Sequence, residues 1–85
     1  MGYLYILQSR LKLKFYIGST IDLGKRVKEH NNGYVISTKY IRPLELKFFK
    51  KFDSIQEARG IEYKIKKLKS RIIVEQIVLQ QEIKL

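Results

Sequence analysis

Two tyrosine-rich apolar segments near the start of the chain, joined by a short polar stretch, most constrain its fold. Residues 2–9 are rich in Tyr, Leu and Ile and alternate weakly in polarity, and residues 15–18 read Phe-Tyr-Ile-Gly. The polar residues 10–14 between them suit a hairpin loop. The sequence therefore predicts an antiparallel β-hairpin at the start of the domain.

The following residues supply a helix and a third strand. We expect a helix from about Asp22 to Asn31-Asn32-Gly33, with the aspartate at its positive end and Gly33 as a left-handed stop. Residues 35–41 could form a short helical turn, and Pro43 favours extended backbone before a strand at residues 44–52. The prediction is an α+β fold, with a three-stranded antiparallel sheet flanked by helices in the order β-β-α-β-α-α.

The last third of the chain is helical in pattern. Ser54-Ile55-Gln56-Glu57 is a capping box, in which the serine hydroxyl caps the first turn and the glutamate reaches back. The helix that it opens carries one apolar stripe, formed by Ala58, Ile61, Ile65, Leu68 and Ile72. The pattern leaves open whether this helix breaks at Ser70 or runs on to Leu85, and Ile73, Ile77 and Val78 could pack as a final helix. We expect one domain over residues 1–85, with 70–85 a C-terminal helical extension.

Composition limits the class of partner. The 85 residues carry a formal net charge of +10, with dense basic clusters at 47–51 and 64–71, and this excess predicts a polyanionic partner. The apolar runs are too short to span a membrane. The absence of cysteine excludes disulfides and thiolate metal sites and suits a reducing, cytoplasmic location.

Helical geometry places three polar residues at the edges of apolar stripes. Arg26 and His30 lie one turn apart on the border of the first helix's stripe, and Glu62 lies at the edge of the later stripe. A border position can hold charged groups in a cleft while their stems pack on the core. Taken singly, these residues also suit plainer roles: a surface arginine, a histidine at a helix C-terminus and a glutamate paired with a lysine.

Five segments together carry a specific resemblance, although the first of them lacks the expected glycine. They are Tyr3-Leu4-Tyr5, Tyr16-Ile17-Gly18, residues 22–33, residues 39–46 and Glu57-Ala58-Arg59-Gly60-Ile61-Glu62. In this order and spacing they resemble the GIY-YIG nuclease family, including the nuclease domain of excision-repair incision subunits. The resemblance covers about three quarters of the chain and implies a metal-dependent endonuclease that hydrolyses DNA, or alternatively RNA, in DNA repair or recombination.

The resemblance also implies roles for individual residues. Glu62 would hold Mg²⁺ or Mn²⁺, Tyr5 would act as general base toward water, and His30 would be the proton partner of Tyr5. Arg26 and Tyr16 would bind the scissile phosphate. We expect these five side chains to converge on one concave basic surface, with Glu62 turned toward the tyrosines. The further residues expected to contact nucleic acid are Lys25, Lys39, Arg42, Lys66 and Lys67.

The chain departs from the family at two positions. Ser19 stands where the repair-incision relatives carry a lysine, and Val74 stands where they carry an asparagine. Family members with defined sequence targets carry an additional DNA-binding domain, for which 85 residues leave no room. Specificity is therefore expected to be weak, structure-directed or supplied by a protein partner. Two other readings stay open: a non-catalytic nucleic-acid-binding module, and a small basic interaction protein whose apolar segment 72–85 docks on a partner or on itself.

Overall fold

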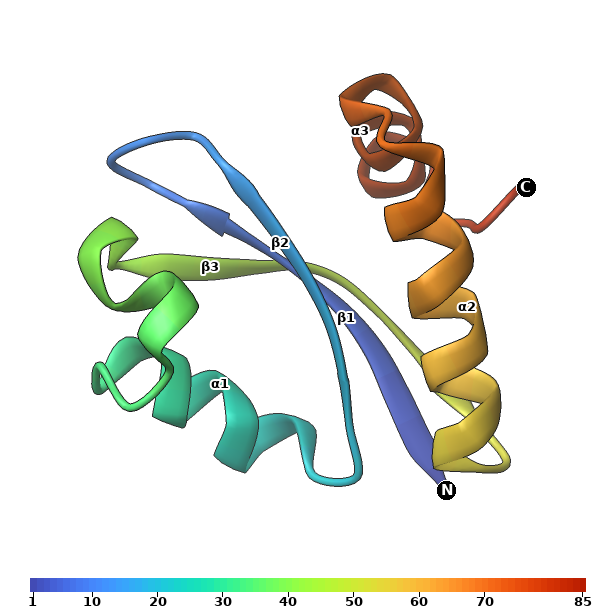
Figure 1. Cartoon of the computed structure of the whole chain (residues 1–85), viewed down its shortest axis with the longest axis horizontal. Helices are drawn as coiled ribbons and strands as arrows, with labels where there is room; N and C mark the ends of the chain where they lie inside the picture. The colour runs from blue at the N-terminus through green and yellow to red at the C-terminus, as the bar shows by residue number, and fades with distance from the viewer.

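The computed structural model describes all 85 residues as a sheet between two helical layers (Figure 1). The strands are β1 (Gly2–Ser9), β2 (Phe15–Thr20) and β3 (Leu44–Phe52). The helices are α1 (Leu23–Asn31), the 3₁₀ helix η1 (Ile36–Ile41), α2 (Ile55–Leu68) and α3 (Arg71–Gln80). The α+β fold and the element order predicted from the sequence are confirmed.

The sheet is antiparallel, with strand order β2-β1-β3. Tyr5 of β1 pairs with Gly18 of β2 and with Phe49 of β3, and the register against β3 shifts at Ile6/Leu7. Strand β1 is thus the central strand, and β2 is an edge strand that runs two residues further than predicted. The strand predicted at residues 44–52 has the expected bounds.

Alternation along the strands gives the sheet two different faces. Leu4 and Ile6 of β1 face α2 and α3 and form the main core with Phe48, Ile65, Val74 and Ile77. Tyr5 and Leu7 point the other way, toward α1 and η1, into a smaller cluster with Leu44. The two helical layers lie on either side of the strands in Figure 1. The core of this short chain is therefore divided between two thin layers.

Helix α1 begins and ends as predicted. The Asp22 side chain accepts a hydrogen bond from the Lys25 backbone N–H (3.1 Å), and Gly33 adopts φ +80° after the last turn. The cap of α2 is confirmed in part, because Ser54 Oγ accepts from the Glu57 N–H (3.1 Å). Glu57 does not reach back to the backbone: its carboxylate accepts from the Ser54 hydroxyl instead (3.3 Å).

The single apolar stripe predicted through Ile72 is wrong at its C-terminal end. Lys69 adopts the left-handed conformation (φ 50°) and ends α2, and Ser70 caps a separate helix, α3. Leu68 is 48% exposed and Ile72 is 66% exposed, so neither belongs to the core. Leu68 is the last residue of α2. Beyond it, the left-handed Lys69 resets the helical phase, so Ile72 turns outward and α3 instead buries Val74 and Ile77.

The segment between α1 and β3 forms a 3₁₀ helix, and Arg42 before Pro43 is extended (φ −65°, ψ 155°), as the proline predicts.

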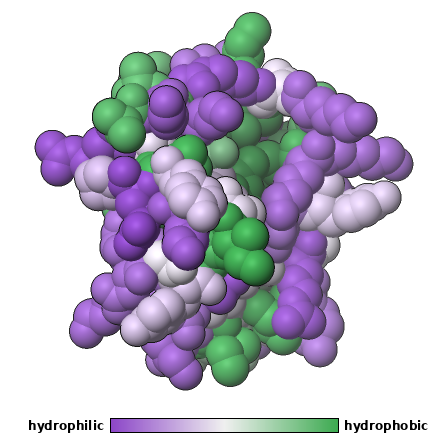
Figure 2. All heavy atoms as spheres, turned by 60° about the vertical axis from the view of Figure 1, so that its left-hand side comes forward, coloured by the Kyte–Doolittle hydropathy of each residue, from purple (hydrophilic) through white to green (hydrophobic).

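Hydrophilic side chains cover most of the face in Figure 2, with smaller apolar patches among them. None of the helices is long and apolar enough to cross a membrane.

Candidate active site

A buried hydrogen-bond chain begins at the Tyr5 hydroxyl. This hydroxyl lies 2.9 Å from His30 Nε2, and His30 Nδ1 lies 2.7 Å from Thr38 Oγ1. Tyr5, His30 and Thr38 are at most 1% exposed. Strand β1, helix α1 and η1 thus each contribute one member. His30 was expected at the border of the α1 stripe, but it is fully enclosed.

The partners of this chain assign the histidine tautomer. The Thr38 hydroxyl donates to the Val35 carbonyl (3.5 Å), so its oxygen is free to accept from His30 Nδ1–H. His30 Nε2 then accepts the Tyr5 proton. The interaction with Tyr5 raises the pKa of Arg26, and a guanidinium can only donate to the Tyr5 oxygen. Both ends of the chain therefore favour the Nδ1–H form.

Burial sets the charge of the pair. It raises the pKa of Tyr5 to about 12, against the opposing effect of Arg26. Burial, followed by the positive charge of Arg26, lowers the pKa of His30 to about 4. Tyr5 is therefore a neutral phenol and His30 a neutral imidazole at pH 7. The raised pKa of Tyr5 and the lowered pKa of His30 both oppose transfer of the tyrosine proton in the unliganded protein.

Tyr16 and Arg26 border this buried pair on its solvent side. The Tyr16 ring stacks edge-on against His30, with centroids 4.8 Å apart, and lies 6.3 Å from the Tyr5 ring. The Arg26 side chain is 36% exposed and bonds to Glu29 at 3.2 Å on its own helix. An exposed guanidinium beside a half-buried phenol suits the binding of an incoming phosphate.

Gly18 makes room for the Tyr5 ring. A Cβ built on Gly18 would clash with the hydroxyl end of that ring, which lies directly over its pairing partner on β2. The glycine is required here by this close approach, because its backbone is ordinary extended strand. The Tyr-Ile-Gly triplet and the Tyr3-Leu4-Tyr5 triplet therefore pack as one unit.

Glu62 lies on α2 at the outer edge of β2. Its Oε1 accepts from the Ser19 hydroxyl at 2.5 Å, and its Oε2 accepts from Lys66 Nζ at 2.6 Å. The Glu62 side chain is 20% exposed. Lys66 Nζ also lies 5.7 Å from the centroid of the Tyr16 ring. Lys66 therefore connects the carboxylate to the tyrosine side of the site.

The expectation that Glu62 would share one surface with the tyrosines is wrong in its geometry. Tyr5 and Gly18 face α1, whereas Ser19 faces α2, because neighbouring strand residues point to opposite faces. The site instead wraps around the free edge of β2. Glu62 is near enough for its negative charge to contribute to the raised pKa of Tyr5, after burial and Tyr16.

A cleft of about 410 Å³ opens at this edge between α1 and α2. Ser19 lies on its β2 side, Lys25 and Arg26 come from α1, and Arg59 comes from α2. Arg26 and the hydroxyl that contacts Glu62 therefore open into the same space, although they belong to different faces of the sheet. Its charged lining is three basic side chains and the two carboxylates of Asp22 and Glu29, which leaves a small positive excess for an anion.

The residues expected to contact nucleic acid fall in three places. Lys25 lines the cleft, and Lys66 pairs with Glu62. Lys39 and Arg42 border a separate hollow beside η1, where Arg42 Nε donates to the Lys39 carbonyl at 2.8 Å. Lys67 is exposed on α2. The structure does not gather these five cations into a single patch.

The donors at Glu62 fit a hard divalent cation held by few protein ligands. No group of three or more His, Cys, Asp or Glu residues could hold a metal ion, which argues against an all-protein cage. Mg²⁺ is ordinarily held by one or two carboxylates together with water and substrate phosphate. Glu62 and the Ser19 hydroxyl offer such a half-open oxygen set, once Lys66 releases Oε2.

Sequence reasoning missed three residues of this site. Thr38 gave no signal, because a single threonine in a basic segment is unremarkable. Ser19 was noted for the lysine that it replaces, yet it contacts the carboxylate directly. Arg59 could have been found, because it precedes Glu62 by three residues and so lies on the same side of α2.

Two neighbouring tyrosines, an arginine, a histidine and a glutamate around the edge of a three-stranded sheet are typical of a nuclease-type domain. The chain belongs to the GIY-YIG catalytic domain family, whose model matches residues 1–75. The family assignment made from the five sequence segments is thus confirmed.

Small bacterial proteins resemble the chain over most of its length. It is 44% identical over 71 residues to a UPF0213 protein of Clostridium perfringens, covering 80% of this chain and 73% of that protein. It is 49% identical over 55 residues to the UPF0213 protein YazA of Bacillus subtilis, covering 64% and 56%. The solution structure of a UPF0213 protein from Bacillus halodurans matches with a TM-score of 0.60 and 36% identity, covering 95% of this chain and 86% of that one.

Proposed function

We propose that the chain is a divalent-metal-dependent endonuclease that hydrolyses phosphodiester bonds of DNA. The observation that carries this proposal is that Arg26 and Ser19 line the same cleft. Ser19 is the hydroxyl partner of Glu62, and Arg26 interacts with Tyr5, the partner of His30. The cleft thus joins a phosphate-binding side to a carboxylate side. The family assignment supports nuclease chemistry in general, and the cleft supplies residues suited to this form of it.

The proposed roles follow from the positions of the side chains. Arg26 and Tyr16 bind the non-bridging oxygens of the scissile phosphate and stabilise the charge that develops there. Tyr5 takes a proton from the attacking water as its own proton passes to His30 Nε2. His30 is then an imidazolium whose Nδ1–H is held by Thr38. The pKa of Tyr5 near 12 and that of His30 near 4 make this transfer uphill until substrate binds.

Glu62 would hold Mg²⁺ or Mn²⁺, with the Ser19 hydroxyl beside it. When bound, such an ion supplies positive charge to the phosphate and lowers the pKa of nearby hydroxyl groups. Lys66 must leave the carboxylate for this to occur. Its long side chain can turn toward the solvent or toward the neighbouring pocket that it also lines.

Specificity is proposed to be structure-directed or supplied by a protein partner. The cleft has few groups that could read base edges, whereas its cations suit the sugar–phosphate backbone. A role in DNA repair or recombination, in a reducing cytoplasm, accords with this weak sequence preference.

Plasmid nicking with Mg²⁺ or Mn²⁺ tests the proposal. The wild-type protein is expected to nick supercoiled DNA with metal and not with chelator, leaving 5′-phosphate and 3′-hydroxyl ends. Glu62→Gln should abolish nicking, because an uncharged amide is a poor ligand for a hard cation. Glu82→Gln, in the exposed segment after α3, removes the same charge away from the cleft and serves as the matched control.

Undiminished nicking by Glu62→Gln would refute the metal assignment. A wild-type protein that binds DNA but never cleaves it would favour the second candidate, a non-catalytic nucleic-acid-binding module. One observation favours that candidate: Lys66 already neutralises Glu62 at 2.6 Å, as in an ordinary helical ion pair. The nicking assay separates the two functions.

A further inference from the structure

A second basic pocket lies beside the candidate active site and is not used by the proposed chemistry. It has a volume of about 330 Å³ and lies between β2, the end of α2 and the start of α3. Its floor is apolar, and its basic side chains are Lys14, Lys66, Lys69 and Arg71. No carboxylate lines it.

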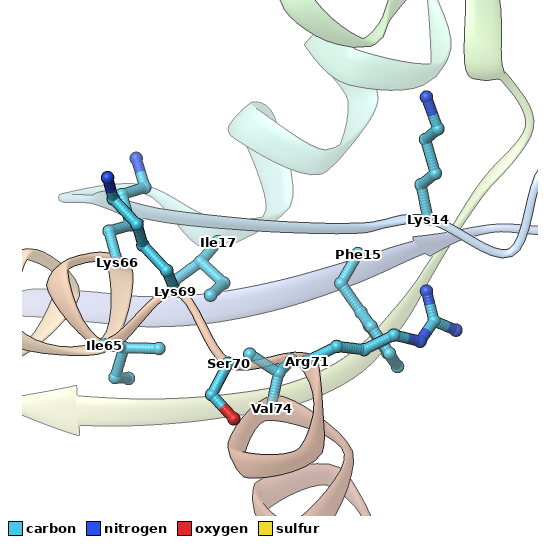
Figure 3. Close-up of a pocket in the computed structure, with 9 residues that line it drawn as sticks. All are labelled: Lys14, Phe15, Ile17, Ile65, Lys66, Lys69, Ser70, Arg71 and Val74. Atoms are coloured by element: carbon cyan, nitrogen blue, oxygen red, sulfur yellow. The ribbon is translucent and has the colours of Figure 1, made fainter.

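The cations are arranged at two ends of an apolar floor. Figure 3 shows Lys66 and Lys69 at one end, beside Ile65, and Lys14 at the other, where its side chain extends to the opposite side from that of Phe15. The side chains of Ile17, Val74 and Phe15 follow one another from the first end to the second. Lys14 and Lys69 are exposed and form no ion pair, so their ammonium groups are available to a ligand.

Arg71 builds one wall of this pocket and is already engaged. Its Nη2 donates to the Leu13 carbonyl at 2.9 Å, and its guanidinium lies 4.9 Å from the centroid of the Phe15 ring. It therefore ties α3 to the β1–β2 hairpin and fixes the shape of the pocket. The start of α3 exists here because Lys69 breaks the preceding helix.

The apolar floor with cations near its ends suits one nucleotide of a single strand, namely one base and the phosphates on either side of it. Successive phosphates of a strand flank each base, and single-strand sites combine cations along the backbone with apolar or aromatic surfaces under the bases. A base held in a duplex is paired and stacked, and it cannot enter a pocket of this kind. An acidic peptide would satisfy the lysines but leave the apolar floor uncovered.

We propose that the pocket between β2 and the α2–α3 junction binds one unpaired nucleotide, with its base on the apolar floor and its flanking phosphates on Lys14 and Lys69. The proposal rests on the proposed function and narrows its substrate to DNA with a single-stranded segment. Lys66 lines the pocket and also contacts Glu62, so the pocket lies next to the carboxylate of the candidate active site.

Binding of fluorescent oligonucleotides without metal tests the subsite apart from cleavage. Wild-type protein is expected to bind an oligothymidylate of eight nucleotides about ten-fold more tightly than an eight-unit abasic phosphodiester of equal charge. Lys14→Gln/Lys69→Gln should weaken single-strand binding and reduce its salt slope by about 1.4, at about 0.7 for each phosphate that is no longer neutralised. Lys12→Gln/Lys51→Gln removes equal charge from exposed sites outside the pocket and should leave the preference for bases unchanged.

Three results would overturn the subsite: equal affinity for the abasic strand, a decrease in affinity that is the same in both double variants, or equal competition by an oligoglutamate peptide. The last would assign the pocket to acidic protein segments. If the subsite fails while the protein still nicks plasmid, the proposed function stands. If the oligonucleotide binds as expected but no DNA is cleaved, the proposed function fails and the subsite stands.

Discussion

At the scale of single residues, Thr38 decides which nitrogen of His30 carries the proton. Thr38→Val keeps the shape of the side chain but removes the acceptor for Nδ1–H, so the preference for that tautomer should fall. The chain contains a single histidine, so ¹⁵N NMR of the imidazole reports it without overlap. Thr38→Ser should restore the wild-type spectrum, whereas an unchanged spectrum in Thr38→Val would show that Thr38 does not set the tautomer.

The buried imidazole should also make stability depend on pH. His30 has a pKa near 4 when folded and near 6.5 when unfolded, so the unfolded state alone binds the proton between these values. Stability is therefore complete above about pH 6.5 and falls as the pH drops toward 4. The expected decrease between pH 7 and pH 5 is about 2 kcal/mol.

Urea denaturation at pH 7 and pH 5 measures that decrease. His30→Gln has no titrating ring and serves as the control, because the remaining carboxylates contribute equally in both proteins. A wild-type protein with the same pH dependence as His30→Gln would contradict the burial of a neutral imidazole.

The candidate residues were visible in the sequence, but their partners were not. Tyr5, Tyr16, Arg26 and His30 were found through motif spacing, which fixes where side chains leave the backbone. Their enclosure depends on η1, a segment without a strong local pattern. The contact between Ser19 and Glu62 joins residues 43 positions apart, and a single sequence contains no signal for such a pair.

At the scale of elements, α3 contributes to the core through one side only. Ile77 is 2% exposed, whereas Leu79 on the same helix is 83% exposed. Ile77→Ala should lower the free energy of unfolding by about 2–5 kcal/mol, a large share of the total for a chain of this length. Leu79→Ala should change it by less than about 0.5 kcal/mol.

Chemical denaturation of both variants checks this prediction. Equal and small decreases would show that α3 is not part of the cooperative unit. Equal and large decreases would mean instead that Leu79 is covered, as in an oligomer, which a sedimentation measurement would then reveal.

Elements with strong local signals were predicted well. Asp22, Gly33 and Ser54 mark helix ends through capping and φ preferences that act within a few residues. The sequence leaves the break at Lys69 open, because lysine has no preference for the left-handed conformation. The break is stabilised by tertiary packing, because it lets Val74 and Ile77 of α3 pack in the main core.

At the scale of the whole molecule, the charge of +10 should appear in the salt dependence of duplex binding. The logarithm of affinity should fall linearly with the logarithm of salt concentration. Lys66→Gln/Lys67→Gln should flatten the slope by about 0.9 for each phosphate that these lysines neutralise. Fluorescence anisotropy of labelled duplex DNA, titrated at salt concentrations from low to physiological, measures this slope. Affinity that is insensitive to salt would favour the basic interaction-protein reading instead.

The close approach of Gly18 to the Tyr5 ring has a consequence for how such a sequence can vary. A side chain at position 18 occupies the space of the tyrosine hydroxyl, so it displaces that group from His30 even though the strand itself tolerates the change. Conversely, a smaller residue at position 5 leaves a hole above the glycine. The two positions are thirteen residues apart but depend on each other sterically. A working replacement at one therefore requires a compensating change at the other, and either change alone disrupts the Tyr5–His30 contact.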